Sequence, residues 1–69
     1  MVEVFKTNVL LREQAVSLLQ LLTENFPEAK INFDLADCDK ILRIESETIN
    51  HSAIKAIMNA QNYICEPLP

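Results

Sequence analysis

The apolar residues of this sequence switch between a two-residue period and a helical period, and that switching limits the folds open to the chain. The two-residue period of a half-buried strand occurs over residues 2–7, 30–35, 40–46 and 63–66. Between these segments, residues 11–25 and 51–61 carry apolar side chains at helical spacing. The sequence therefore predicts the element order β-α-β-β-α-β.

The same periods predict which side chains form the core. The predicted inward positions are Phe5 and Thr7 on the first strand; Leu11, Ala15, Val16, Leu18 and Leu22 on the first helix; Ile31, Phe33, Leu35, Leu42 and Ile44 on the hairpin; and Ile54, Ile57, Met58 and Gln61 on the second helix. Because the chain contains no glycine, turns have to use other residues. We expect Asn50 to cap the start of the second helix and Asn62 to end it in the left-handed conformation. We expect Pro67 and Pro69 to stop the last strand.

This element order predicts an α+β fold of the ferredoxin-like type in a single domain over residues 1–69. Such a fold has a four-stranded antiparallel sheet in the order 4-1-3-2, with both helices on one face. Its geometry brings three connections to one end of the sheet: residues 8–12, 36–39 and 62–63.

Charge and composition exclude several classes of function. The net charge is −4, with 10 acidic and 6 basic residues, and no basic stripe is present for nucleic acid. The apolar stretches are too short to span a membrane, and the N-terminal residues do not resemble a signal peptide. Without glycine there is no phosphate-binding loop or dinucleotide fingerprint. We expect a cytoplasmic protein whose two cysteines are reduced thiols.

Length, element order and several short segments resemble the heavy-metal-associated (copper-chaperone-type) domain family. Ile31-Asn32-Phe33-Asp34-Leu35 is similar to the family's V-x-V-x-L second strand. The segment Ala53–Met58 followed by Asn62-Tyr63 resembles the family's second helix and closing Gly-Tyr, with Asn62 in place of the glycine. The resemblance covers essentially the whole chain.

The family's metal ligands are missing from this sequence. In the family, Met-x-Cys-x-x-Cys opens the first helix, and the alignment places Leu10 at the methionine, Arg12 at the first cysteine and Ala15 at the second. Two thiolates there bind Cu(I) or Zn(II), but arginine and alanine offer no ligand atom. We therefore expect no cofactor and no metal bound with the affinity of a chaperone.

Two cysteines and one histidine are the remaining candidates for chemistry. Cys38 lies on the predicted hairpin turn between Asp37 and Asp39, so it is either an exposed turn residue or one soft ligand among carboxylates. Cys65 is expected to be a small buried apolar residue, and a disulfide between the two is not expected. His51 begins the second helix without a second ligand nearby. No nucleophile-and-base constellation is present, so we expect no enzyme.

Two surfaces are candidates for binding another protein. On the sheet face away from the helices, alternation places Val2, Val4, Ile41 and Ile64, which together form a possible apolar patch. At the other candidate surface lie Leu10, Arg12 and Tyr63. Arg12 is either a contact for an anion or partner or an ordinary exposed side chain, and Tyr63 either supports a site or packs on the first helix.

The leading hypothesis is a relative of the copper chaperones without their metal site, acting as a protein-interaction module linked to metal homeostasis. It would bind a protein partner, or a second copy of itself through the open sheet face. One alternative is weak metal binding through Cys38 and the neighbouring carboxylates. A second alternative is a dimeric regulatory domain that binds a small molecule.

Overall fold

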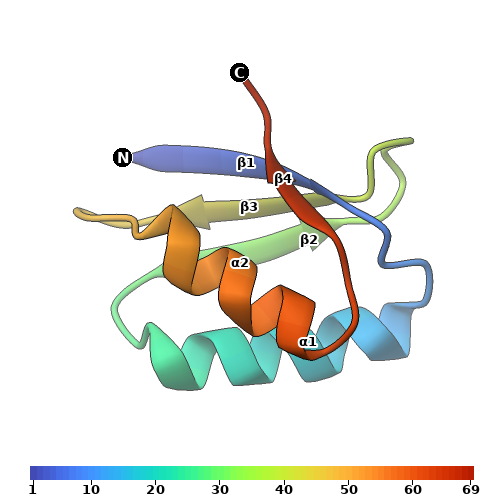
Figure 1. Cartoon of the computed structure of the whole chain (residues 1–69), viewed down its shortest axis with the longest axis horizontal. Helices are drawn as coiled ribbons and strands as arrows, with labels where there is room; N and C mark the ends of the chain where they lie inside the picture. Colours follow the sequence, from blue (N-terminus) through green and yellow to red (C-terminus); the bar gives the residue numbers. More distant parts are fainter.

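The computed structural model describes residues 1–69, and its elements follow the predicted order. They are β1 (Val2–Thr7), α1 (Arg12–Asn25), β2 (Lys30–Asp34), β3 (Ile41–Glu45), α2 (His51–Ala60) and β4 (Cys65–Pro67). The strands form one antiparallel sheet in the order β2-β3-β1-β4, which is the predicted order read from its other edge. Both helices lie on the same side of this sheet (Figure 1), so the ferredoxin-like α+β fold is confirmed.

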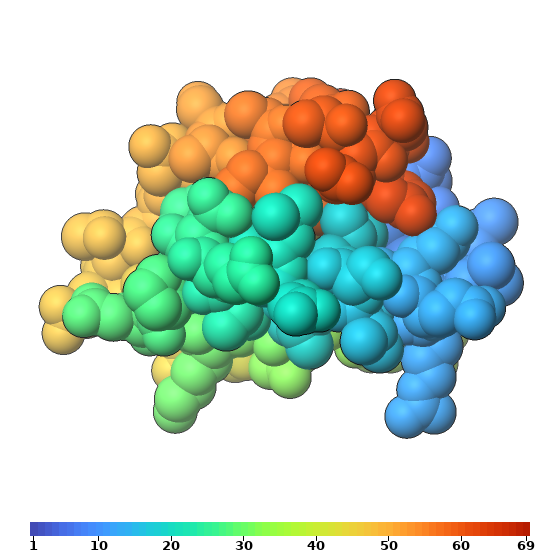
Figure 2. Space-filling view, turned by 90° about the horizontal axis from the view of Figure 1, so that it is seen from below, coloured from blue at the N-terminus to red at the C-terminus, as the bar shows by residue number.

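The core lies between the helices and the sheet. Viewed from the helix side, α1 and α2 lie next to each other and cover it (Figure 2). Its buried apolar residues are Phe5, Val9, Ala15, Leu18, Leu22, Ile31, Leu42, Ile44, Ile54, Met58 and Cys65. Thr7 is the one buried polar residue. Most of the predicted inward positions are thus confirmed, with Phe33, Leu35 and Ile57 packed at the margin of the core.

Three residues predicted to point inward are exposed instead: Leu11, Val16 and Gln61. Leu11 precedes the first turn of α1 in an extended conformation, so it lies off the helical stripe. Gln61 follows the last residue of α2, so it also lies off the helical stripe. Val16 is 59% exposed because the helix turns about 100° per residue, and Ala15 already faces the sheet. Val16 consequently points beyond β2, where no further strand follows.

The ends of the helices depend on a few polar side chains. The Gln14 side chain accepts hydrogen bonds from the backbone N–H groups of Leu10 and Leu11 at the start of α1. Asn50 caps α2 as predicted, because its Oδ1 accepts a hydrogen bond of 3.0 Å from the N–H of Ala53. These contacts satisfy backbone groups that have no partner inside the helix.

Asn62 ends α2 as predicted, with φ at 69°. The N–H of Tyr63 donates to the Met58 carbonyl at 3.0 Å, and the N–H of Asn62 donates to the Asn59 backbone carbonyl at 2.9 Å. This pair of bonds is the Schellman arrangement, in which glycine is the usual residue because it carries no Cβ. Asparagine tolerates the left-handed region better than most residues, and this chain uses it in glycine's place.

The last strand differs from the prediction, because β4 begins at Cys65 and includes Pro67. Pro67 lies opposite Phe5. The next pair along the ladder, Val4 with Leu68, is a hydrogen-bonded pair, because the Leu68 N–H donates to the Val4 carbonyl. Hydrogen-bonded pairs alternate along an antiparallel ladder, so the nitrogen of Pro67 faces the free edge of the sheet. Its missing N–H therefore costs no ladder bond.

Neither helix of the structure has the length and apolar character needed to cross a membrane.

Candidate functional site

Three connections meet at one end of the sheet, as the topology predicts, and this region is called the loop end here: residues 8–12, 35–40 and 61–64. The N–H of Thr7 donates to the Asp39 carbonyl at 3.0 Å, and the Thr7 hydroxyl donates to the Lys40 carbonyl. The Asn8 side chain accepts a hydrogen bond of 2.9 Å from the N–H of Ile64. The hairpin turn and the last connection are therefore fixed to the end of β1.

Thr7 is the central residue of these contacts, and the sequence pattern gave no signal of this role beyond its inward face. Its hydroxyl oxygen also accepts a hydrogen bond of 3.2 Å from the N–H of Val9. Thr7 and Val9 are both buried, so the Val9 N–H has no access to water, whereas Lys40 is half-buried. One hydroxyl thus holds the turn from Lys40 against the loop that leads into α1.

The start of α1 carries Arg12 and Ala15, the two positions that the expected alignment places at the family's cysteines. Arg12 is the first residue of α1 and is exposed, whereas Ala15 is only 7% exposed and faces the core. Arg12 makes no salt bridge or side-chain hydrogen bond. Leu10 and Leu11, just before it, are 69% and 51% exposed. This turn therefore presents two leucines and one unpaired cation, and neither Arg12 nor Ala15 carries a ligand atom for a soft metal.

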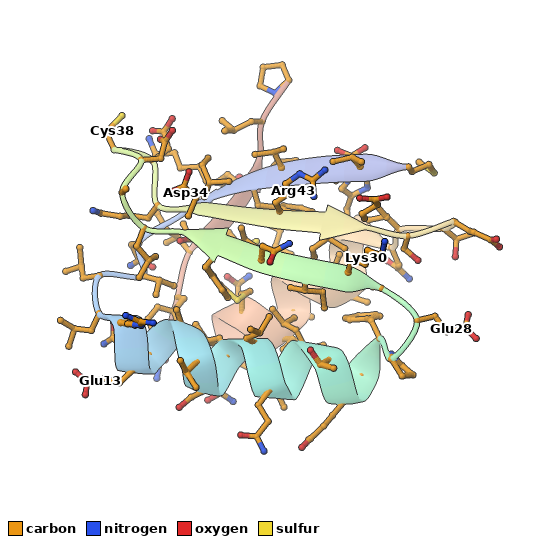
Figure 3. All side chains as sticks on the ribbon, turned by 180° about the vertical axis from the view of Figure 1, so that it is seen from behind. Glu13, Glu28, Lys30, Asp34, Cys38 and Arg43 are labelled. Carbon is orange, nitrogen blue, oxygen red and sulfur yellow. The ribbon has the colours of Figure 1, made fainter.

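The hairpin turn carries the one group of side chains with metal-ligating atoms close together. Ligand atoms of Asp37, Cys38 and Asp39 lie within 4.8 Å of one another. The Asp37 carboxylate accepts a hydrogen bond of 2.8 Å from the Asp39 N–H, and Asp39 also lies 4.0 Å from the Lys6 ammonium. Both carboxylates thus have partners within the fold. Figure 3 shows Cys38 projecting from the sheet side of this end, while Glu13 marks the helix side.

Lys40 shapes that turn through an uncommon backbone conformation. Its φ is 49°, in the left-handed region that glycine usually occupies. The conformation is supported by a hydrogen bond of 3.0 Å from its N–H to the Asp37 carbonyl, and by one of 3.0 Å from its ammonium group to the Leu35 carbonyl. The position of Cys38 is thus a consequence of turn geometry.

Tyr63 lines an open hollow between α1 and the connection that follows α2, with a volume of about 340 Å³. The hollow is lined by Glu13, Gln14, Ser17, Leu18, Leu21, Gln61 and Tyr63. Tyr63 is half-buried and packs against the core beside α1. Tyr63 thus packs against the core and also lines the hollow, so both expectations for Tyr63 stay open.

No family model matches this chain, and a search of curated proteins finds no match to it. The resemblance to heavy-metal-associated domains thus depends on residue pattern and element order.

The open face of the sheet is more polar than the alternation pattern suggested. Val2 and Ile64 are exposed, and Val4 and Ile41 are half-buried. Arg43 lies directly opposite Val4 on the neighbouring strand. Figure 3 shows Arg43, Lys30 and Asp34 on this side of the sheet. The four predicted residues consequently do not form an uninterrupted apolar patch.

Neither Cys65 nor His51 belongs to the metal-ligating cluster: Cys65 pairs with Thr7 at the loop end but is buried in the core, and His51 begins α2. Cys65 is a free thiol, 1% exposed, and its burial raises the pKa of the thiol to about 11. It is therefore a core residue, as predicted. The His51 Nε2 lies 3.4 Å from a Glu3 carboxylate oxygen, and its ring lies 5.6 Å from that of Phe5. His51 thus contacts Glu3 and Phe5 of β1, at the end of the sheet opposite Cys38. The sequence pattern did not predict these contacts.

Proposed function

We propose that this protein is a non-catalytic relative of the heavy-metal-associated domains that has lost their metal site and works by binding another protein in metal homeostasis. The observation that supports the proposal is the composition of the first turn of α1. Arg12 and Ala15 stand where the family has its cysteines, in a chain with the same element order. The turn lies at the loop end, and neither Arg12 nor Ala15 offers a ligand atom for copper.

The same turn offers what a protein interface needs. Leu10 and Leu11 expose most of their side chains next to Arg12, which has no ionic partner within the chain. Leucine side chains gain about 1.5–3 kcal/mol when they are fully buried, so a partner that covers them would gain a substantial part of its binding energy there. Arginine at the centre of an interface commonly contributes strongly to binding as well. We assign the partner site to Leu10, Leu11 and Arg12.

The metal half of the proposal is tested by competition for Cu(I) against a chelating indicator under reducing conditions. The wild-type protein is expected to leave the copper with the indicator. The double substitution Arg12→Cys with Ala15→Cys is expected to bind one Cu(I), because two thiolates three residues apart at a helix start share one face and favour a soft metal. Adding Leu10→Met restores the family's flanking residue.

A matched control uses the same spacing one residue later, Glu13→Cys with Val16→Cys. Both of these positions are exposed, so the control pair is not expected to unfold the protein. It lies one residue further from the helix start, and position 16 lacks the shelter from water that position 15 has. Equal Cu(I) affinity for the two pairs would remove the residue-level argument for the family assignment.

The partner half is tested by a photo-crosslinking amino acid at position 10, introduced in cells that make the protein naturally. We expect one discrete crosslinked protein, and we expect Arg12→Glu to abolish it. The same crosslinker at Glu47, an exposed residue between β3 and α2, is the control for random collisions. Identical products from both positions, or no product at position 10, would refute a partner site at the loop end.

A second candidate function is weak metal binding at the hairpin turn, favoured by the convergence of Asp37, Cys38 and Asp39 within 4.8 Å. One thiolate with two carboxylates suits no metal well, and both carboxylates have partners of their own. The copper competition separates the two functions. One-to-one binding by the wild type that disappears in Cys38→Ser would establish the hairpin site and overturn the proposal of a lost metal site.

A further inference from the structure

The sheet has one blocked edge and one free edge. At the β4 edge the strand is three residues long and contains Pro67. At the other edge, β2 is five residues long and pairs only with β3. An unprotected edge strand is a template for pairing with another strand. The β2 edge is therefore the place where this sheet can be extended.

The register of the ladders shows which backbone groups face that free edge. The Ser46 N–H donates to the Met1 carbonyl, so Met1 and Ser46 are a hydrogen-bonded pair. Such pairs alternate along an antiparallel ladder, so the next ones between β1 and β3 are Glu3 with Ile44 and Phe5 with Leu42. The intervening residues of β3 then bond to β2 through their partners Lys30, Asn32 and Asp34. Ile31 and Phe33 consequently direct their N–H and C=O groups outward.

The sequence of β2 is complementary to itself in the antiparallel direction. In a pairing centred on Asn32, Lys30 lies opposite Asp34 of a second copy, and Ile31 lies opposite its Phe33. Each Asn32 meets its own counterpart, and amides can both donate and accept. Opposite charges and matched apolar pairs face each other on the correct sides of the sheet. We propose that a second copy of this chain pairs with β2 through this register, giving a two-fold dimer with a continuous eight-stranded sheet.

Other registers are less favourable. A shift of one residue places apolar side chains opposite polar ones and puts the second copy's helices on the wrong face. A shift of two residues in one direction places Glu28 opposite Asp34 of the second copy, so like charges meet twice. The opposite shift places Asn32 opposite Asp34 and leaves Lys30 opposite Ala36. Only the register centred on Asn32 pairs every charge of the strand.

The side of α1 next to this edge supports the same arrangement. An open hollow of about 420 Å³ lies between α1 and β2, lined by Arg12, Ala15, Val16, Leu19, Asn32, Phe33 and Leu35. Asn32 and Phe33 point to opposite faces of the sheet, so the hollow reaches the edge of the strand. Val16, Leu19 and Phe33 line it although they lie outside the buried core.

The two-fold axis of this pairing runs perpendicular to the sheet, so the two α1 helices lie on the same side of the extended sheet. They would cover each other's exposed flank, including Val16. A standard stable interface buries about 800 Å² per partner, and the whole chain exposes 4525 Å². A strand edge of five residues alone is too small, so the flank of α1 has to contribute. Arg12 lines this hollow and also belongs to the proposed partner site, whereas Lys30 and Asp34 do not, so substitutions on β2 test the dimer separately from that site.

The test is sedimentation equilibrium under reducing conditions at tens to hundreds of micromolar protein. The wild type is expected to dimerise. Lys30→Asp and Asp34→Lys each place like charges opposite each other twice, and each is expected to weaken dimerisation on the order of tenfold. An equimolar mixture of the two variants is expected to restore dimers as heterodimers, because every charged pair is then opposite again. Lys55→Asp on α2 is the control for the change in net charge.

A wild type that stays monomeric throughout this range would overturn the inference. So would dimers that Lys30→Asp and Asp34→Lys leave unchanged, or a mixture that fails to restore what the single variants lose. Dimers that Val4→Lys with Ile41→Lys abolishes, and the β2 variants do not, would assign the interface to the open sheet face instead. Circular dichroism of each variant shows whether it is folded, and none of the substituted side chains belongs to the core.

Discussion

Replacing Thr7 with valine removes one hydroxyl and changes the shape of the side chain very little. In the wild type this hydroxyl donates to the Lys40 carbonyl and accepts from the Val9 N–H. Thr7 is 4% exposed and Val9 is fully buried, so water cannot replace the hydroxyl at the Val9 N–H, whereas the Lys40 carbonyl belongs to a half-buried residue. Valine leaves one buried donor and one carbonyl unsatisfied at the point where β1, the hairpin turn and the loop before α1 meet.

The size of the effect follows from those two bonds. A buried polar group left without a partner costs about 1–3 kcal/mol, so Thr7→Val is expected to lower the free energy of unfolding by about 2–3 kcal/mol. The control Thr7→Ser keeps the hydroxyl and loses one methyl group, which costs about 1 kcal/mol. For a domain of this size, 1 kcal/mol corresponds to about 4–8 °C in Tm. Thr7→Val should therefore melt about 10–20 °C below the wild type.

Urea denaturation followed by far-UV circular dichroism measures the difference. The m-value should stay constant across the three proteins, because the surface exposed on unfolding is the same. Hydrogen exchange adds a local readout, since the Val9 amide should lose protection in Thr7→Val and keep it in Thr7→Ser. If valine is tolerated as well as serine, the hydroxyl does not hold the loop end together and the reasoning is refuted.

Three further changes test other features of the fold. Asn62→Gly should raise the free energy of unfolding by about 0.5–1 kcal/mol and Asn62→Ala should lower it by about 1 kcal/mol, both measured by urea titration, because φ is 69° there. Asn50→Ala should cost about 1 kcal/mol through loss of the α2 cap, whereas Asn50→Ser should cost little; equal losses would contradict the cap. Because burial raises the pKa of Cys65 from 9.0 to about 11, the folded state disfavours the thiolate, so stability is complete below pH 9 and falls between pH 9 and 11. Subtracting the pH profile of Cys65→Ala isolates that fall, of about 2–3 kcal/mol, and parallel profiles would disprove it.

The sequence alone determined the element order and most of the core, because these depend on short-range periodicity. Alternation identified the faces of β1, β2 and β3, and helical spacing identified Ala15, Leu18 and Leu22. Asn50 and Asn62 were predictable for the same reason, since caps and left-handed turns are chosen by local backbone chemistry. From the order of the elements, topology then predicted that three connections meet at one end.

Only the tertiary structure decided which half of an amphipathic surface is covered. Val16 belongs to the apolar stripe of α1, yet it is exposed because the sheet ends at β2. Pro67 can occupy β4 because that strand is the other edge and the proline nitrogen faces outward. The sequence pattern likewise did not predict the partners of Thr7 or the contact of His51 with Glu3, because each joins residues far apart in the sequence. Periodicity assigns a residue to a face of its own element, whereas a hydrogen bond or a free edge depends on which distant segment lies beside it.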